Sequence, residues 1–478
     1  MTATRPLTSP IVSLDPDTSK SRVRAVLAAA VAVVVAAALA MIAGSLLAVF
    51  VIVGLVIVVV GAAFLWNEPN ALFPIAMYVM WFEALPPGPI NSGRTVAFLA
   101  IALPAARILT SSWRFPAIQP RVWLPTMLLL MWSILSLMWS AKAGGWLSEF
   151  LALFLGISYA VLFAVFVESP AQIMRLLRSF IIVGVVIGGL SMLVHYGLGY
   201  RSFGFTGGPN QYAALNVMSV PICVVLVRRS DGWWRTFFAL AIPVFFFATL
   251  SAGSRSGLIG LAITSGFCFV LRPGLSIRQR VKWSVLGFVG ILGGFLVAGF
   301  VDAERFSLLG FFADRGAGRL DIWAAGMDGL RDHWVLGFGL GGFQKEALQL
   351  LQKATGASLD VARQEDFKNT NTIPAHNLFF QAILDLGIVG FVLYFGTFAV
   401  AAKNLRDMLR TEWGDVAWIG LGIIVSFIGM APFATGLNQK LPWAAVGLSG
   451  AYFVRHAVTD RATRREGRVA VGRSDGPR

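Results

Sequence analysis

The chain has few charged residues and few of the side chains that build metal or thiol sites. Only 13% of its 478 residues are charged, and it contains two cysteines and four histidines. Soluble domains carry about 25% charged residues, whereas 57% of this chain is hydrophobic. One water-soluble core cannot bury so much apolar surface, so the composition excludes an ordinary soluble protein and indicates a membrane protein.

The two cysteines, Cys223 and Cys268, both fall within apolar segments. They lack the clustered spacing of a disulfide framework or a metal site. The histidines and acidic residues form no group with metal-ligand spacing either. We therefore expect both thiols to be packing residues, and we expect no metal and no cofactor.

Long apolar runs predict an all-α polytopic membrane protein with about 14 transmembrane helices. A helix needs about 20 apolar residues to span a bilayer. The first run is longer than the apolar core of a signal peptide, so we expect it to be retained. The runs containing Pro74 and Pro104 are the weakest. The predicted spans lie near 23–43, 45–65, 69–85, 94–110, 122–139, 147–167, 175–196, 210–228, 233–250, 255–271, 281–300, 377–402, 415–434 and 438–455.

The positions of Lys and Arg place both termini in the cytoplasm. Cytoplasmic loops carry the excess of these residues. With the N-terminus inside, 26 of the 39 fall in inner segments, five in short outer loops and eight in one long outer segment. The expected order is a cytoplasmic tail (1–22), eleven helices (23–300), a long outer loop (301–375), three helices (376–455) and a basic cytoplasmic tail (456–478).

The formal charge of +15 does not indicate a nucleic-acid partner. The basic tail has no aromatic residues between its arginines after Phe453. Arginine-rich tails at the inner membrane surface are attracted to anionic lipids. We therefore expect a solvated tail whose partners are membrane lipids.

The long outer loop is expected to be partly helical. Residues 319–333 have helical spacing, with one apolar stripe formed by Leu320, Trp323, Met327 and Leu330. A second short helical run covers 343–353. Loops of this length are usually functional or disordered, and the aromatic content disfavours disorder.

His376 is the first candidate for chemistry, because it opens the span after the long outer loop. Pro374 suits a helix start, and the positive end of a helix dipole disfavours a charged imidazole. A neutral His376 would be able to act as a general base. Gly387 and Gly390 are expected to lie on the same helix face, and small residues let membrane helices approach closely. The alternative is an interfacial histidine that only forms hydrogen bonds.

Two arginines are candidates for binding an anion. Arg255 lies at the outer start of a span among small residues, where exposed backbone N–H groups attract phosphate and a guanidinium fork matches its oxygens. The alternative is an arginine that extends to the membrane interface. Arg319 opens the first helical run of the outer loop, and by itself it is an ordinary surface arginine.

Three polar residues near the outer ends of spans have weaker assignments. Asn210 and Gln211 open the eighth predicted span, where their amides either bind sugar hydroxyls or cap the helix. Asp385 lies about 13 Å along the helix from His376. Acids within spans are functional candidates, but this one has no evident partner and its role is open.

Two further patterns do not support their usual functions. Gly337-Phe-Gly-Leu-Gly-Gly342 matches a dinucleotide-binding pattern, but that motif requires a preceding strand and a βαβ unit, so we predict a tight turn. Asp15-Pro-Asp17 resembles a metal-binding acidic pair but lies in the inner tail. We therefore expect no nucleotide site at either pattern.

The chain resembles the O-antigen ligase and O-antigen polymerase family of bacterial membrane glycosyltransferases. The resemblance covers roughly 205–430, and the His-Asn, nine residues, Gly-x-x-Gly pattern is its most specific part. Ile259 departs from a common ligase pattern, which has leucine four residues after the arginine. The similar stretches are Phe205–Asn210, Ser254–Gly257, Arg319–Trp323 with Leu336–Phe343, and His376-Asn377 through Gly390.

The resemblance implies a metal-independent, inverting transfer at the periplasmic face of the bacterial inner membrane. The donor is a glycan on undecaprenyl pyrophosphate, and the acceptor is a glycan or lipid A core, in O-antigen or exopolysaccharide biosynthesis. Arg255 and Arg319 are expected to hold the pyrophosphate, and His376 to activate the acceptor hydroxyl. Asn210, Gln211 and Asn377 are candidate glycan or support contacts. Other polysaccharide assembly proteins are candidate partners.

Two other functions remain open from the residues alone. A transporter or lipid-linked sugar flippase usually has charges near the bilayer midplane or repeated halves. Most span interiors here lack charges, and the sequence shows no repeat. A non-catalytic partner in a polysaccharide export complex is the third possibility.

Overall fold

The computed structural model contains only helices, turns and irregular segments in the residues that it describes. These are 72–83, 98–99, 120–140, 143–198, 202–206, 208–270, 275–282, 284–285, 289, 293, 319–355, 373–434, 437 and 439–453. The labelled helices are α3 (Leu72–Val79), α5 (Pro120–Leu135), η2 (Ser136–Met138), α6 (Ala143–Phe166), α7 (Pro170–Leu198), α8 (Pro209–Arg229), α9 (Gly232–Ser251), α10 (Arg255–Ser265), η3 (Gly266–Val270), α14 (Arg319–Leu330), α15 (Gly342–Thr355), α17 (Leu378–Met408), α18 (Gly414–Met430) and η4 (Ala431–Phe433).

Several of these helices are long and apolar enough to cross a bilayer. Each coincides with a predicted span, so the chain is a multi-pass, helical membrane protein. The six longest candidates are Gly145–Phe166, Pro170–His195, Pro209–Arg229, Gly232–Ser251, Leu378–Met408 and Gly414–Phe433, and two shorter apolar helices are Trp123–Met138 and Arg255–Val270.

The predicted total of about 14 helices is not confirmed. The predicted spans 23–43 and 45–65 lie outside the described residues, as do most of 94–110 and 281–300 and the pair Asp15 and Asp17. Within 69–85 the structure has only the eight-residue helix α3. A final helical stretch covers 440–453, within the last predicted span.

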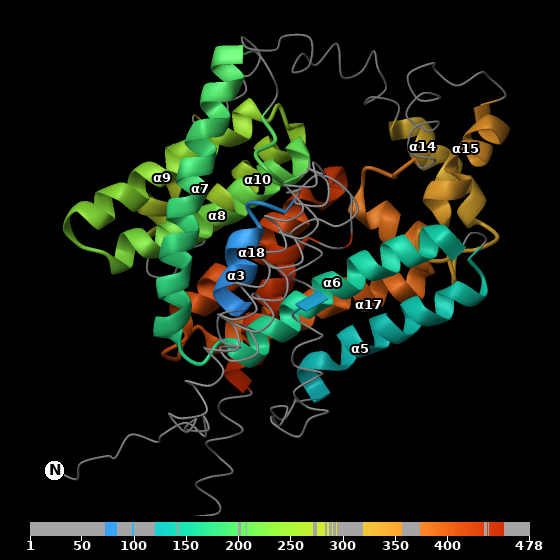
Figure 1. Ribbon diagram of the computed structural model, residues 1–478, viewed down its shortest axis with the longest axis horizontal. Coiled ribbons are helices and arrows are strands. Elements are labelled where there is room, and N and C mark those ends of the chain that lie inside the picture. The colour runs from blue at the N-terminus through green and yellow to red at the C-terminus, as the bar shows by residue number, and fades with distance from the viewer. Residues whose placement is uncertain are drawn as a thin grey trace, which may run out of the picture. The chain divides into compact units, whose positions relative to one another are not determined.

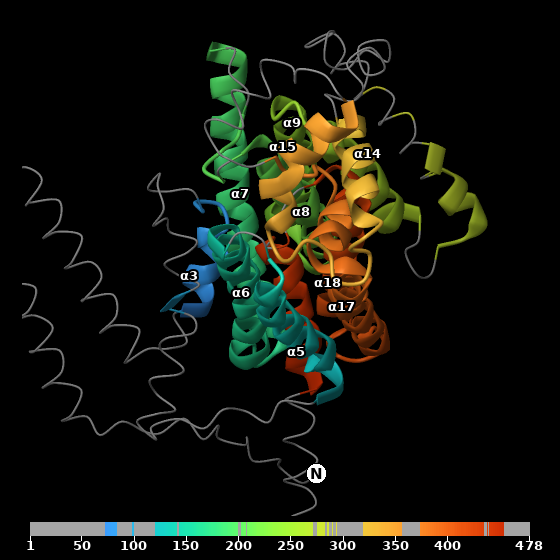
Figure 2. The same ribbon diagram turned by 90° about the vertical axis from the view of Figure 1, so that its right-hand side faces the viewer.

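The helices pack in two neighbouring sets that share α18 (Figures 1 and 2). In the first set, α8 packs against α9 and α10, and α7 packs against α9. In the second set, α17 packs along α5, and α15 contacts both α6 and α17. The two sets are joined because α18 contacts α8 and α10 on one side and α17 on the other.

Short turns between the helices determine which helix ends lie together. The hydroxyl of Ser254, just before α10, donates to Asn210 Oδ1 at the start of α8 (2.9 Å). The position of a Cβ on Gly260, early in α10, lies against Met430 at the end of α18. Since α18 follows α17 through a short turn, α8, α10 and α17 all begin at the same end of the bundle. We call this the start end.

The bundle interior is apolar, with small polar side chains paired inside it. Thr264 and Ser426 form a buried hydrogen bond of 2.6 Å between α10 and α18. Cys223 and Cys268 are free and fully buried, which confirms that they are packing residues. Buried hydroxyl pairs of this kind join neighbouring membrane helices.

Candidate active site

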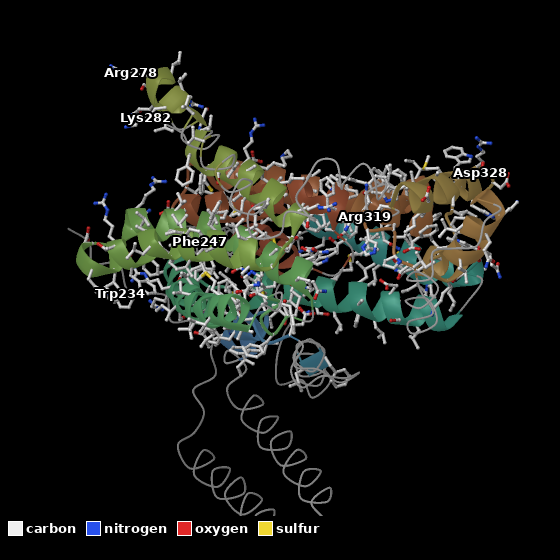
Figure 3. The ribbon with its side chains drawn as sticks, turned by 90° about the horizontal axis from the view of Figure 1, so that it is seen from above. Trp234, Phe247, Arg278, Lys282, Arg319 and Asp328 are labelled. Atoms are coloured by element: carbon white, nitrogen blue, oxygen red, sulfur yellow. The ribbon has the colours of Figure 1, made fainter. Side chains whose placement is uncertain are left out.

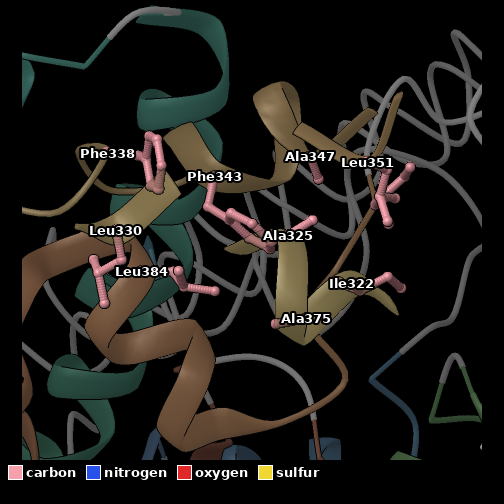
Figure 4. Close-up of a cluster of buried hydrophobic side chains, with 10 residues drawn as sticks. Ile322, Ala325, Leu330, Phe338, Phe343, Ala347, Leu351, Ala375 and Leu384 are labelled. Atoms are coloured by element: carbon pink, nitrogen blue, oxygen red, sulfur yellow. The ribbon is translucent and has the colours of Figure 1, made fainter. Parts of the chain in front are cut away.

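Residues 319–355 form a folded unit on the first turns of α17. Helices α14 and α15 pack against each other, and both contact α17. Both helical runs predicted in this segment are therefore confirmed. Figure 4 shows the shared apolar cluster, which consists of Ile322, Ala325, Leu330, Phe338, Phe343, Ala347, Leu351, Ile373, Ala375 and Leu384.

The predicted apolar stripe of α14 is only partly correct, because Leu330 is buried and Trp323 packs against the cluster, but Leu320 and Met327 do not. Leu320 and Met327 are 50% and 46% exposed, whereas the buried face carries Ile322, Ala325, Gly326 and Leu330. The reason is close packing at a small residue: a Cβ on Gly326 would lie 3.0 Å from Leu384 and 3.1 Å from Phe343. The face of α14 that permits this close approach is therefore the buried face, although it does not carry the largest apolar side chains of the helix.

His376 has an unusual backbone conformation at the entry to α17. Its φ angle is 51°, and it is the one non-glycine residue with a positive φ among the described residues. The helix cap is Asn377, whose side chain accepts hydrogen bonds from the N–H groups of Phe379 (2.9 Å) and Phe380 (3.2 Å). His376 therefore precedes the cap rather than opening the helix, and Asn377 has a structural role. Strained backbone at a polar residue is common in active sites.

Helix α14 is bound directly to the residue before His376. The indole Nε1 of Trp323 donates to the carbonyl oxygen of Ala375 (2.7 Å), and its ring stacks on Phe380 at 5.2 Å. Arg319, labelled in Figure 3, is the first residue of α14 and is half-buried. Residues four apart share a helix face, so the structure places Arg319 one turn from the Trp323 contact and on the same face.

The glycine-rich turn is inserted into a break in α17. Gly387 has φ 67° and ψ −173°, which interrupts the helix. Across the break, the N–H of Phe338 donates to Leu384 O (2.8 Å) and the N–H of Ile388 donates to Trp334 O (2.9 Å). A Cβ on Gly387 would overlap the backbone of Val335.

This break corrects the prediction that Gly387 and Gly390 share the face of His376 along a continuous helix. The left-handed conformation of Gly387 ends that helical register, so the eleven-residue spacing does not define a face. The predicted tight turn at 337–342 is confirmed, and α15 starts at its last glycine. Gly337 and Gly387 permit insertion of this turn, whereas the Cβ position of Gly390 lies 3.1 Å from Trp132 of α5, where a small residue permits close helix packing.

Asp385, whose role the sequence left open, lies fully buried beside the start of α15. It accepts a hydrogen bond from the N–H of Phe343 (3.3 Å) and another from the side-chain amide of Gln381. A carboxylate at a helix N-terminus is stabilised by the helix dipole. Asp385 therefore joins α17 to α15.

Arg255 is the first residue of α10, as predicted. Ser254 caps this helix by accepting from the N–H of Gly257 (3.2 Å). Asn210 accepts from the Ser254 hydroxyl, and the cap of its own helix α8 is Gly208. Asn210 therefore supports the start of α10 instead of capping α8, which excludes the simple capping interpretation.

Gln211, the next residue, lines a small, partly open pocket with apolar as well as polar walls. The pocket also contains Glu83, Thr206, Gln439 and Lys440. Lys440 is buried and forms an ion pair with Glu83. The Oε1 atom of Gln439 is buried without a hydrogen-bond partner. The pocket therefore offers amide, carboxylate and ammonium groups beside the start of α8.

The structure brings the predicted residues together in two pairs at the start end of the bundle. Asn210 and Arg255 lie at the adjoining starts of α8 and α10, and Arg319 and His376 lie on adjoining parts of α14 and α17. Helix α18 contacts both α10 and α17. Sequence analysis missed Trp323 and Gln381 as neighbours of His376, because an aromatic residue and an amide in helices give no distinctive signal.

The comparison with known families matches this part of the chain. Residues 237–395 match a family described as O-Antigen ligase. The match spans α9, α10, α14, α15 and the first part of α17, which includes Arg255, Arg319 and His376. It confirms the resemblance to the O-antigen ligase and polymerase family. It supports a membrane glycosyltransferase of this type and gives no support to a transporter or flippase. No curated protein matches the chain.

Proposed function

Because residues 237–395 carry an O-antigen ligase domain, we propose that the chain transfers or polymerises a glycan from undecaprenyl pyrophosphate onto an acceptor hydroxyl. The reaction takes place at the periplasmic face of the bacterial inner membrane. The observation that carries this proposal is the conformation of His376, which is strained and held at the first turn of α17 beside the helix that starts with Arg319.

His376 acts as the general base. Its imidazole takes the proton of the acceptor hydroxyl as the hydroxyl oxygen attacks the anomeric carbon of the donor sugar. The bond from that carbon to the pyrophosphate oxygen breaks, and undecaprenyl pyrophosphate leaves. Attack opposite the leaving group inverts the anomeric configuration. A positioned base contributes about 10²–10⁴-fold to such a step.

Arg255 and Arg319 bind the pyrophosphate. Each is the first residue of a helix at the start end of the bundle, where the positive end of the helix dipole favours an anion. Negative charge develops on the pyrophosphate as it leaves, and two guanidinium groups stabilise that charge. The proposed mechanism therefore assigns no role to a metal ion.

The pocket beside Gln211 binds sugar hydroxyls. Its ammonium and carboxylate groups, Lys440 and Glu83, are paired with each other, so the pocket carries little net charge. A pocket of this kind suits an uncharged polyhydroxyl group better than a pyrophosphate. The amides of Gln211 and Gln439 supply both donors and acceptors.

The orientation follows from the residues at the opposite end of the bundle. Trp233 and Trp234, at the start of α9, are 65% and 45% exposed, and they follow Arg228 and Arg229. Tryptophan is enriched at membrane interfaces and arginine on the cytoplasmic side. This arrangement supports a cytoplasmic location for that end and a periplasmic location for His376.

Transfer in vitro from a purified lipid-linked donor tests the proposed activity. The full chain in proteoliposomes is expected to release undecaprenyl pyrophosphate and to lengthen or glycosylate the acceptor. His376→Ala should abolish transfer while the protein still inserts. His333→Ala, at an exposed position of the same outer segment, is the matched control and should remain active. Full activity of His376→Ala would remove the proposed base.

The glycan chain length in a deletion strain distinguishes the two versions of the reaction. Loss of a polymerase leaves single repeat units on the acceptor. Loss of a ligase leaves long glycans that are not attached to it. Unchanged glycans in the deletion strain would contradict both versions.

A further inference from the structure

A line of buried polar groups runs along the first turns of α17 toward His376. Asp385 accepts from the side-chain Nε2 of Gln381. The Oε1 atom of Gln381 in turn accepts from the backbone N–H of Ala375 (3.2 Å). Gln381 is 2% exposed and Asp385 is fully buried. The line therefore connects the start of α15, through Asp385, to the residue that precedes His376.

Hydrogen bonds hold the backbone of Ala375 from two sides. Its N–H is bound by Gln381, and its carbonyl oxygen is bound by Trp323 (2.7 Å). That carbonyl belongs to the peptide unit between Ala375 and His376. The hydrogen bond from Trp323 therefore fixes the orientation of this peptide plane, which is one of the two planes that define the φ angle of His376. Asn377 fixes the following residues as the helix cap.

These bonds provide a reason for the left-handed conformation of His376. A left-handed backbone costs a non-glycine residue about 1–2 kcal/mol. Such strain persists only where the surrounding structure enforces it. The contacts on both sides of His376 supply that constraint, so they determine the direction in which the imidazole leaves the backbone.

The backbone N–H of Ala375 sets the orientation of the Gln381 amide. An N–H group only donates hydrogen bonds, so it faces the carbonyl oxygen of that amide. The NH₂ group of the amide is then left to face Asp385, whose oxygen accepts from it. Asp385 therefore holds the amide in the orientation that Ala375 requires.

We propose that Trp323 and Gln381 are positioning residues for His376, with Asp385 holding Gln381 in the required orientation. This inference rests on the proposed role of His376 as the base. It assigns α14 and α15 a function in catalysis, because both helices contribute a group to the network. Displacement of a catalytic group by about 1 Å can cost about 10²-fold in rate.

The test uses Trp323→Phe and Gln381→Met in the full-length protein in proteoliposomes. Both variants keep much of the side-chain volume and remove the hydrogen bond. We expect kcat to fall by up to about 10²-fold, with little change in the KM for the donor. The matched control is Trp139→Phe, which removes an indole hydrogen bond to Leu336 O (3.1 Å) away from Ala375 and should keep its kcat.

The pH profile of kcat and the double variant separate positioning from general stability. Groups that act through one catalytic residue are strongly non-additive. The double variant of Trp323→Phe and Gln381→Met should therefore lose little more kcat than the more affected single variant, and both single variants should change the pH profile of kcat. A double variant whose loss equals the product of the two single losses, or an unchanged kcat and pH profile in both single variants, would overturn the proposal.

Failure of the positioning role can be distinguished from failure of the proposed function. If His376→Ala is inactive while Trp323→Phe and Gln381→Met are fully active, only the positioning role is wrong. If His376→Ala is active, the base itself is wrong. Trp323→Phe keeps an aromatic ring to stack on Phe380, so it provides the measurement if Gln381→Met does not fold.

Discussion

The indole nitrogen of Trp323 lies 2.7 Å from the carbonyl oxygen of Ala375. This single bond ties the helix that begins with Arg319 to the residue that precedes His376. Without it, the proposed pyrophosphate-binding arginine and the proposed general base would lie on two independent segments. Their relative position is thus set by α14 as well as by α17.

Replacement of Gly387 by alanine is expected to separate the glycine-rich turn from α17. The residue is left-handed, and a Cβ would overlap the backbone of Val335. The backbone region of Gly387, with φ 67° and ψ −173°, costs a non-glycine residue about 1–3 kcal/mol. We expect a lower Tm for the detergent-solubilised protein and a loss of transfer.

Gly396→Ala is the matched control, because Gly396 lies in the same helix and has no atom within 4 Å of its Cβ position. Alanine is the better helix former by about 1 kcal/mol, so the control should have an equal or higher Tm. Equal Tm values for the two variants would contradict the role assigned to the break.

The two proposed pyrophosphate ligands should not tolerate lysine. Arg255→Lys and Arg319→Lys keep the charge but lose the bidentate fork. Hydrogen bonds to charged groups contribute about 1.5–3 kcal/mol, so kcat/KM for the lipid-linked donor should fall at least about tenfold. Steady-state transfer kinetics measure this effect.

Arg331→Lys is the control for these substitutions. Its side chain is 81% exposed at the far end of α14, where it pairs with Asp328. We expect kinetics unchanged from the natural protein. Wild-type kinetics in Arg255→Lys or Arg319→Lys would remove that arginine from the binding site.

Asn377 is expected to act through its cap and not through the glycan. Asn377→Ala should destabilise the start of α17 by about 1 kcal/mol. Asn377→Ser and Asn377→Asp keep a capping oxygen and should retain activity and Tm. If both conservative variants lost activity at an unchanged Tm, Asn377 would contact the substrate directly.

The orientation of the bundle can be tested with thiol labelling, because both native cysteines are buried. Cysteines introduced by His333→Cys and Arg410→Cys occupy exposed positions, on the outer segment and on the turn between α17 and α18. A membrane-impermeant maleimide should label the first in intact spheroplasts and the second only after lysis. The reverse pattern would place His376 in the cytoplasm.

Much of the fold could be predicted from hydrophobic runs, because the length of a membrane helix is set by the bilayer. The starts of α8, α10 and α17 were predicted to within one residue of their observed positions. The break at Gly387 could not be predicted, since it depends on insertion of a turn about fifty residues earlier in the chain. The exposure of Leu320 and Met327 depends likewise on the close contact at Gly326.

The positions of the candidate residues could be predicted in part. Arg255 and Arg319 are the first residues of helices, as the sequence indicated, and His376 lies just before the Asn377 cap of α17. Gln381 and Trp323 give no local signal, because their partners are backbone atoms of Ala375. Asp385 can be identified from the sequence as an acid within a span, but its partner is an N–H group of α15, which no sequence pattern specifies.

Helices α14 and α15 share their apolar cluster with Ala375 and Leu384 (Figure 4). A fragment excised between the flanking spans would lack this anchor and would expose Phe338 and Phe343 to water. Crystallisation, antibody selection or inhibitor screening with such a soluble fragment would therefore present a surface that the intact protein does not have.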